Sequence, residues 1–175
     1  MSIILGINKD HSDSSACLLL NGKLTGAVAE ERLGKRIKHD PSFPSNSIEW
    51  LLKDANIKFK DIDIIAVSNN GKSNFKEKFL HAFDFSILNL IKKIKSKIFN
   101  KSSIDKEIKK LCIKSGENIN HLKYEIYKVE HHLAHIASSY YLSGYKNKTA
   151  ALSYDGSGDG VSIMLAECDN CKIKV

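Results

Sequence analysis

The sequence predicts an α/β fold in which a mixed sheet is flanked by helices, and three observations lead to that prediction. Short apolar runs bounded by polar turns recur along the chain, as expected for strands. Between them lie segments whose apolar residues recur at three- and four-residue spacing, which is typical of amphipathic helices. A chain of 175 residues with 42% hydrophobic content can bury one ordinary core, so we expect one domain.

The first strands are expected to form a hairpin. Residues 3–8 are an apolar run that ends in a polar turn, and residues 14–20 form a second run. Asn21 and Gly22 supply the two positive-φ residues of a type I′ turn, which leads into a third strand at 23–30. The hairpin therefore holds a polar loop at its open end.

A helix and a fourth strand follow. Apolar residues between 48 and 55 have helical spacing, and Ser45-Asn46-Ser47 precede them as capping residues. Glu49 stands three residues after Asn46, as in a capping box. The apolar run 63–68 then predicts a strand.

Residues 72–114 form a lysine-rich segment with twelve lysines and four acidic residues, although the whole chain carries only +7. Helical spacing at 75–98 and again at 104–114 indicates a helical insertion at about 72–118, with its lysines in water. A basic amphipathic helix could instead bind RNA or an anionic membrane. Because aromatic residues for base stacking are missing from its charged side, we favour the solvated helix over nucleic acid or membrane contact.

A histidine cluster follows the strand predicted at 124–129. In Glu130-His131-His132-Leu133-Ala134-His135, a helix beginning at Glu130 places His131 and His135 one turn apart on one face, where both imidazoles can reach one ion. His132 points roughly 100° away around the helix axis. The helix should continue to Gly144 as its C-cap. A pair of histidines at this spacing favours a metal site over two core histidines.

A glycine-rich loop follows the next strand, 149–154. Its backbone N–H groups can approach a phosphate closely, because glycine has no side chain, and we predict that it binds a cofactor. Either Asp155 or Asp159 could join the histidines on the metal. The cofactor-binding residues are Gly156, Ser157, Gly158, Asp159 and Gly160.

The chain should end in a hairpin, with a strand at 161–167 that turns at Asp169-Asn170. Cys168 and Cys171 have the spacing of half a zinc knuckle, but a hairpin turn explains them better because a second pair is missing. Four cysteines are too few for a secreted disulfide framework. Neither a leader nor a membrane-spanning run is evident, so we expect a soluble, cytoplasmic protein.

The chemistry of the predicted ligands limits the choice of metal. Imidazole nitrogen together with carboxylate oxygen suits iron, zinc or manganese better than magnesium alone. We expect a divalent ion, iron first, that polarises a carbonyl or anchors a phosphate or hydroxyl. Magnesium remains an additional candidate, as a companion to bound phosphates.

Four blocks of residues together resemble the N-terminus of the NodU/CmcH-type O-carbamoyltransferases of nodulation and antibiotic biosynthesis. The match extends from Ile4 to Gly160, in one order along the chain. The blocks are Ile4-Leu5-Gly6-Ile7 with His11, Ser14 and Ala16; Ala29-Glu30-Glu31-Arg32 with Lys38-His39-Asp40 and Phe43-Pro44; Glu130 to His135; and Asp155 to Gly160.

The resemblance implies a fold and a reaction. The fold would be a ribonuclease-H-like (actin/sugar-kinase-like) half-domain, related to the tRNA threonylcarbamoyl-transfer protein. ATP and carbamoyl phosphate would be the substrates, with a carbamoyl-adenylate intermediate and transfer to a hydroxyl of a sugar or natural product. By position, His131, His135 and Asp155 would hold the metal. His11 would be a catalytic base near the acceptor hydroxyl, with Lys38 and His39 as further catalytic candidates.

Family members are several hundred residues long, so we expect residues 1–175 to be an incomplete N-terminal portion of the carbamoyltransferase domain, a gene fragment or a split subunit. A second chain would then supply the missing half-domain and the YrdC-like domain that makes the adenylate, and the chain would not be active alone. Two alternatives stay open. One is a threonylcarbamoyl-transfer-like tRNA-modifying protein, and the other is a non-catalytic basic binding module.

Overall fold

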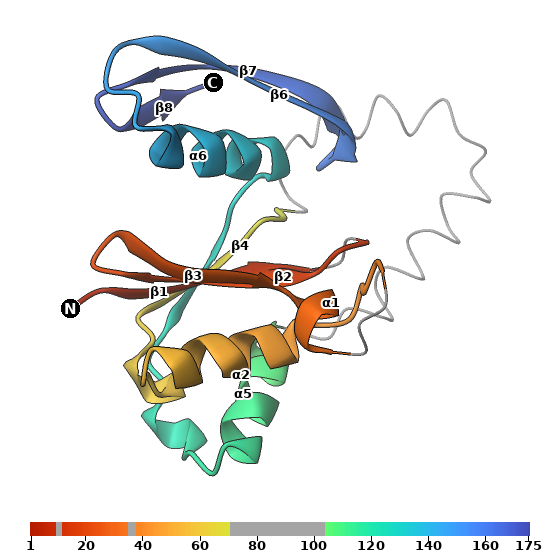
Figure 1. The fold of residues 1–175 in the computed structure, drawn as a ribbon, viewed down its shortest axis with the longest axis vertical. Helices are drawn as coiled ribbons and strands as arrows, with labels where there is room; N and C mark the ends of the chain where they lie inside the picture. Colours follow the sequence, from red (N-terminus) through yellow and green to blue (C-terminus); the bar gives the residue numbers. More distant parts are fainter. Residues whose placement is uncertain (10–11, 35–37, 71–103) are drawn as a thin grey trace. The chain divides into compact units, whose positions relative to one another are not determined.

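The computed structural model describes residues 1–9, 12–34, 38–70 and 104–175 (Figure 1). The helix predicted at 75–98 and the candidate His11 lie outside the described residues. The chain divides into two compact units. Unit 1 comprises Met1–Ser68 and Asn100–Lys128, and unit 2 comprises Asn69–Phe99 and Val129–Val175.

Unit 1 contains a mixed five-stranded sheet in the order β3-β2-β1-β4-β5. The first three strands are antiparallel neighbours, β4 pairs with β1 in parallel, and β5 pairs with β4 in parallel. This confirms the predicted α/β class and the ribonuclease-H-like half-domain. The strands are β1 Ile3–Asn8, β2 Ser15–Leu20, β3 Lys23–Ala29, β4 Ile64–Val67 and β5 Glu125–Lys128.

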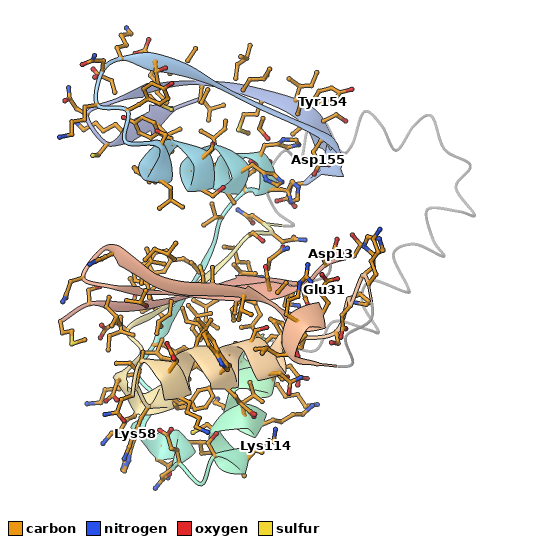
Figure 2. All side chains as sticks on the ribbon, viewed as in Figure 1. Asp13, Glu31, Lys58, Lys114, Tyr154 and Asp155 are labelled. Carbon is orange, nitrogen blue, oxygen red and sulfur yellow. The ribbon has the colours of Figure 1, made fainter. Side chains whose placement is uncertain are left out.

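Two longer helices and three short ones accompany this sheet. The helices α2 and α5 lie on the same face of the sheet in Figure 1. Lys114 at the end of α5 binds Glu49 of α2 at 2.8 Å (Figure 2). The helices are α1 Glu30–Leu33, α2 Ser45–Asp54 and α5 Ile104–Lys114, with 3₁₀ turns at Phe59–Asp61 and Ile119–His121.

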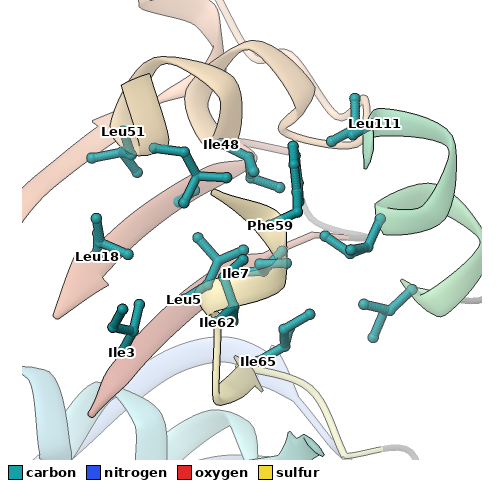
Figure 3. Close-up of a cluster of buried hydrophobic side chains, with 14 of the residues drawn as sticks. Ile3, Leu5, Ile7, Leu18, Ile48, Leu51, Phe59, Ile62, Ile65 and Leu111 are labelled. Carbon is teal, nitrogen blue, oxygen red and sulfur yellow. The ribbon is translucent and has the colours of Figure 1, made fainter. Parts of the chain in front are cut away.

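The core of unit 1 lies between the sheet and these helices (Figure 3). Side chains along β1 alternate between buried and half-buried, which is the period-2 pattern of a strand with one face on a core. Leu5 and Leu18 from neighbouring strands are fully buried, together with Ile48 of α2 and Ile108 of α5. The second helix of the predicted insertion therefore packs its apolar side into this core.

The start of α2 differs from the prediction. The helix begins at Ser45, and its N-cap is Pro44, which has no side-chain oxygen to accept a hydrogen bond. The buried carboxylate of Glu30 accepts the backbone N–H groups of Asn46 at 3.0 Å and Ser47 at 2.9 Å instead. The predicted capping by residues 45–47 is wrong, because a tertiary contact satisfies these donors.

The described part of unit 2 contains a three-stranded antiparallel sheet, β6-β7-β8, with helix α6 on one face. Ile136 and Tyr140 of α6 pack against Ala166 and Cys168. Gly144 ends α6 with a φ of 77°, as predicted for its C-cap. The elements are α6 His131–Ser143, β6 Thr149–Gly158, β7 Val161–Asp169 and β8 Lys172–Lys174.

The turn between β7 and β8 is one residue later than predicted. The left-handed residues are Asn170, with φ 45°, and Cys171, with φ 58°. Cys168 lies in β7 and is buried, whereas Cys171 lies in the turn and is exposed. Across the described ranges, no helix combines the length and the apolar content needed to cross a bilayer.

Candidate metal centre

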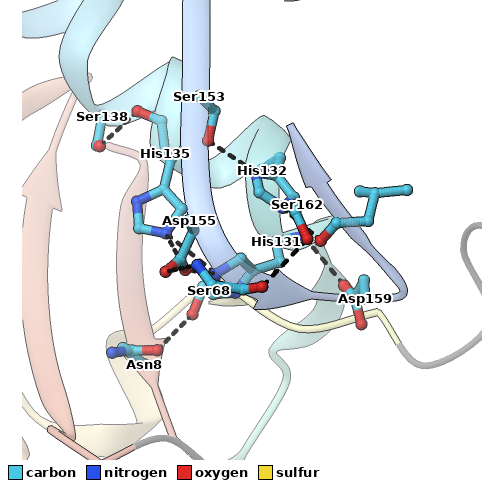
Figure 4. A network of polar contacts seen from close by, with 12 residues as sticks. Asn8, Ser68, His131, His132, His135, Ser138, Ser153, Asp155, Asp159 and Ser162 are labelled. Atoms are coloured by element: carbon cyan, nitrogen blue, oxygen red, sulfur yellow. Dashed lines mark hydrogen bonds and ion pairs between the residues drawn. The ribbon is translucent and has the colours of Figure 1, made fainter. Parts of the chain in front are cut away.

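Two histidines from the first turns of α6 and one aspartate from β6 converge in unit 2 (Figure 4). Nε2 of His131 lies 2.9 Å from Oδ2 of Asp155. Nε2 of His135 lies 3.1 Å from Nε2 of His131 and 3.6 Å from the same oxygen of Asp155. The three residues predicted as metal ligands thus form one group whose ligand atoms lie within 4.8 Å of one another.

These separations are close to those around a divalent ion. Nitrogen and oxygen ligands about 2.0–2.2 Å from a tetrahedral ion lie about 3.3–3.6 Å apart, whereas the observed separations are 2.9, 3.1 and 3.6 Å. The His131 ring would therefore move away from Asp155 and His135 by a few tenths of an ångström to share an ion with them. Nε2 of His131 and Nε2 of His135 also face each other, as two nitrogens that bind one ion do, and without an ion one of them can donate a hydrogen bond to the other. The donor set favours iron, zinc or manganese, and it does not identify the ion.

The surroundings of Asp155 favour the ionised form of its carboxyl group. The hydrogen bond from His131 and then the one from the backbone N–H of Gly156, at 2.6 Å, lower the pKa of Asp155 from 3.8 to about 2. Positive charge on His131 and His135 contributes in the same direction. The group is therefore ionised at neutral pH, which is the form that binds a metal.

Two carboxylates hold the N-terminus of α6. Glu130 is the N-cap and accepts the backbone N–H of Leu133 at 2.7 Å. Oδ2 of Asp159 accepts the N–H groups of His131 at 3.0 Å and Asn70 at 2.8 Å. Negative groups are favourable at this end of a helix because the helix dipole is positive there. Of the two aspartates considered as ligands, Asp155 lies with the histidines, whereas Asp159 binds the backbone.

His132 binds strands β6 and β7 and does not join the group formed by His131, His135 and Asp155. Its side chain is fully buried, and Nε2 lies 2.9 Å from the backbone oxygen of Val161. That oxygen can only accept, so Nε2 carries the proton, and Nδ1 accepts the hydroxyl of Ser153 at 2.8 Å. Sequence reasoning set His132 apart by its direction on the helix, but it did not identify Ser153 as its partner.

Gly158 has a role that sequence reasoning missed. A Cβ atom at this position would overlap the ring of His131, so only glycine lets this histidine occupy its place. At Gly156, in contrast, a Cβ would meet nothing within 4 Å among the described residues. The strand β6 continues to Gly158, so the predicted loop is shorter than expected: only Asp159 and Gly160, with positive φ values of 49° and 93°, form the turn before β7. Phosphate binding by residues 156–160 stays a prediction. The structure does not describe the side chain of Ser157.

The other catalytic candidates belong to unit 1. Nδ1 of His39 lies 2.9 Å from Oδ1 of Asp13, and the backbone N–H of His39 donates to Glu31 at 3.3 Å. His39 has a φ of 62°, in the left-handed region that is unusual for a residue other than glycine. Lys38 is exposed. Asp13 was not predicted from sequence, because 26 residues separate it from His39.

Fold and site together define a class: an α/β protein with a ribonuclease-H-like sheet and a possible His-His-Asp metal site. The chain belongs to the family described as carbamoyltransferase N-terminus, which it matches over residues 3–172.

Two curated relatives are similar to most of the chain. It is 29% identical over 168 residues to the uncharacterized protein sll1178 of Synechocystis, covering 94% of this chain and 27% of that protein. It is 29% identical over 162 residues to the nodulation protein NolNO of Sinorhizobium fredii, covering 93% of this chain and 22% of that protein. The chain thus spans about a quarter of the length of these relatives.

Solved structures with a similar chain path include YeaZ from Pseudomonas aeruginosa, with a TM-score of 0.45 at 12% identity, covering 99% of this chain and 63% of that one. Another is the Ppx/GppA family member from Aquifex aeolicus. It has a TM-score of 0.34 at 10% identity, with 99% of this chain and 49% of that one covered.

Proposed function

We propose that this chain is the metal-binding part of an ATP-dependent O-carbamoyltransferase. The carbamoyl group would come from carbamoyl phosphate, pass through a carbamoyl-adenylate, and reach a hydroxyl of a sugar or small natural product. The observation that carries the proposal is the convergence of His131, His135 and Asp155 in a chain that belongs to the carbamoyltransferase family. The remaining steps would use regions outside the share of the longer relatives that this sequence matches.

In the proposed metal site, three residues would bind the ion and His132 would hold the helix that carries two of them. His131 and His135 present their Nε2 atoms, and Asp155 adds a negative charge that lowers the cost of bringing a cation there. His132, through Ser153 and Val161, keeps α6 against the hairpin so that the two ligand rings stay in register. When bound, the ion would act as a Lewis acid on a carbonyl or phosphate oxygen.

His39 and Asp13 are suited to proton transfer. With Nδ1 directed to the carboxylate of Asp13, the imidazole is held in one orientation and Nε2 is the nitrogen that can accept a proton. In the proposed transfer, the acceptor hydroxyl forms a bond to the carbamoyl carbon, AMP leaves, and the hydroxyl proton goes to a base such as His39. His11, whose position is not described, is the alternative base.

Metal binding is tested first. The chain is purified, loaded separately with Fe²⁺, Zn²⁺ and Mn²⁺, and its metal content and affinity are measured. We expect His131→Ala and His135→Ala to weaken binding on the order of 100-fold. His121→Ala is the matched control, because His121 is an exposed histidine of unit 1, and it should bind like the wild type. Equal metal content in all four proteins would refute the ligand assignment.

Carbamoyl transfer is tested separately. The chain is co-expressed with the part of sll1178 that follows the shared region, and AMP release is followed with ATP, carbamoyl phosphate and a panel of hydroxyl compounds. We expect release that needs carbamoyl phosphate and that His131→Ala abolishes. A protein that binds metal normally but shows no release dependent on carbamoyl phosphate would retain the metal site and refute the reaction.

A further inference from the structure

The backbone of unit 1 has an uncommon conformation at His39. Its φ of 62° lies in the left-handed region, which residues with a Cβ atom seldom adopt. Such a conformation persists only where the surrounding contacts hold it, and residues of this kind gather at functional sites. The contacts around His39 therefore show which residues keep it in place.

Two neighbouring residues of the loop after β1 bind His39 and the residue that follows it. Oδ1 of Asp13 lies 2.9 Å from Nδ1 of His39. Ser14 donates both its backbone N–H and its hydroxyl to the backbone oxygen of Asp40, each at 3.0 Å. Ser14 is 1% exposed and Asp40 is 8% exposed, so these two bonds are shielded from water. The carboxylate of Glu31 accepts the N–H of His39 at 3.3 Å.

The loop that carries Asp13 is itself attached to the ends of two parallel strands. Asn8, the last residue of β1, donates its amide N–H to the backbone oxygen of Asp13 at 2.9 Å. The hydroxyl of Ser68, the first residue after β4, donates to the side-chain oxygen of Asn8 at 2.8 Å (Figure 4). Strands β1 and β4 pair in parallel. In α/β sheets, ligands bind outside the carboxyl ends of such strands, so His39 is held at that edge.

We propose that Ser14 is a positioning residue for proton transfer by His39. Its two hydrogen bonds to Asp40 keep residue 39 left-handed and keep Nδ1 of His39 on Asp13, so that Nε2 is the nitrogen that accepts the proton. In the transfer step, the acceptor oxygen bonds to the carbamoyl carbon, AMP leaves with the bonding electrons, and the hydroxyl proton moves to Nε2. The inference rests on the proposed function in taking His39 as the base.

The substitution Ser14→Ala isolates this role. It removes the hydroxyl and keeps the backbone N–H that also binds Asp40, so the fold should be retained while the loop is held less firmly. Ser42→Ala is the matched control in the same loop. Ser42 is exposed and binds the carboxylate of Asp40 through its backbone N–H, which the substitution keeps.

The imidazole is observed by nitrogen-15 NMR of the metal-free chain at a pH where His39 is neutral. The signal of His39 is identified by its loss in His39→Asn. We expect the wild type to carry the proton on Nδ1, because Nδ1 donates to Asp13. In Ser14→Ala the ratio of the Nε2–H form to the Nδ1–H form should rise about fivefold, the factor that corresponds to one hydrogen bond. An unchanged ratio, or an equal rise in Ser42→Ala, would overturn the proposal.

The backbone conformation is tested by a second pair of variants. His39→Val should unfold at a lower urea concentration than His39→Asn, because valine is branched at Cβ and disfavours left-handed backbone, whereas asparagine tolerates it. Equal midpoints would show that residue 39 is not left-handed in solution, and the positioning role would then lose its basis.

Carbamoyl transfer, measured as AMP release with the co-expressed part of sll1178, separates this inference from the proposed function. Ser14→Ala should lower kcat about fivefold and leave KM for the acceptor nearly unchanged, and Ser42→Ala should keep the wild-type kcat. A wild-type kcat in Ser14→Ala would refute the role of Ser14 and leave the reaction standing. No release from the wild type would refute the reaction, whereas the NMR ratio would still decide whether Ser14 positions His39.

Discussion

The β1–β2 and β6–β7 hairpins share their register at two cross-strand pairs, since Leu5–Leu18 and Ile7–Ala16 in the first correspond to Leu152–Leu165 and Tyr154–Ile163 in the second, 147 residues later. They differ in the connection, which is residues 9–14 in the first and only 159–160 in the second, and in what covers the strands. Asn8 ends β1, and its amide binds Asp13 and Ser68 at 2.9 and 2.8 Å. Its equivalent, 147 residues later, is Asp155, which faces two histidines. The same strand–turn–strand motif can therefore position quite different residues. In unit 2 the neighbouring helix α6 supplies the two histidines that contact Asp155.

The largest difference should appear in the core. Leu5→Ala should lower the free energy of unfolding of unit 1 by about 2–5 kcal/mol, because it leaves a cavity at a fully buried site. Leu152→Ala, at the equivalent exposed position, should change the free energy by less than about 0.5 kcal/mol. Urea unfolding measures both, with Trp50 fluorescence reporting on unit 1. Similar losses at the two positions would mean that the side chain of Leu152 is buried in solution.

The next largest difference should be in how much the carboxylate at each helix N-terminus stabilises its unit. Glu30 accepts hydrogen bonds from Asn46 and Ser47, two from backbone N–H groups and two from side chains, at 2.6–3.0 Å. Because Glu30→Ala leaves the two donors of buried Ser47 unsatisfied and removes the partner of the exposed Asn46, it should cost about 3 kcal/mol. Glu130→Ala removes a half-buried N-cap of α6 and should cost about 1 kcal/mol. Urea unfolding again measures the difference, and a larger loss for Glu130→Ala would contradict this order.

The glycines of the second loop separate packing from phosphate binding. Gly158→Ala should displace the ring of His131, with a cost of about 1–3 kcal/mol and a loss of metal affinity of about 10-fold to 100-fold. Gly156→Ala has room for its methyl group among the described residues and should keep the affinity. Metal titration of the two variants distinguishes them. Equal affinities would show that His131 is not held as described.

The smallest effect is a dependence on pH in metal-free protein. The pKa of Asp155 is lowered from 3.8 to about 2, first by the hydrogen bond from His131. The stabilisation that follows is present above the ordinary pKa and is lost as the pH falls toward about 2, where the carboxyl group of the folded protein becomes protonated. The difference in stability between wild type and Asp155→Asn should therefore shrink between pH 5 and pH 3, measured with a chelator present. A difference that does not change with pH would contradict it.

Much of the fold and part of the site followed from local patterns. Strands, α6 with its cap at Gly144, and the i,i+4 pair His131 and His135 depend on periodicity and on residues that are neighbours in sequence. The positive φ values of Asn21 and Gly22 confirm the predicted turn for the same reason. Phosphate binding by the glycine loop and the roles of His11 and Lys38 stay predictions, since they concern ligands or undescribed residues.

The sequence alone determined most strands and helices, the family motifs and the candidate ligands, because each of these depends on residues only a few positions apart. Only the tertiary structure decided that Glu30 holds the start of α2, that Asp155 joins the histidines while Asp159 binds the backbone, and that Gly158 makes room for His131. These pairs lie 16 to 28 residues apart along the chain. Contacts between residues so far apart in sequence depend on how helices and strands pack, and a local sequence pattern does not predict that packing.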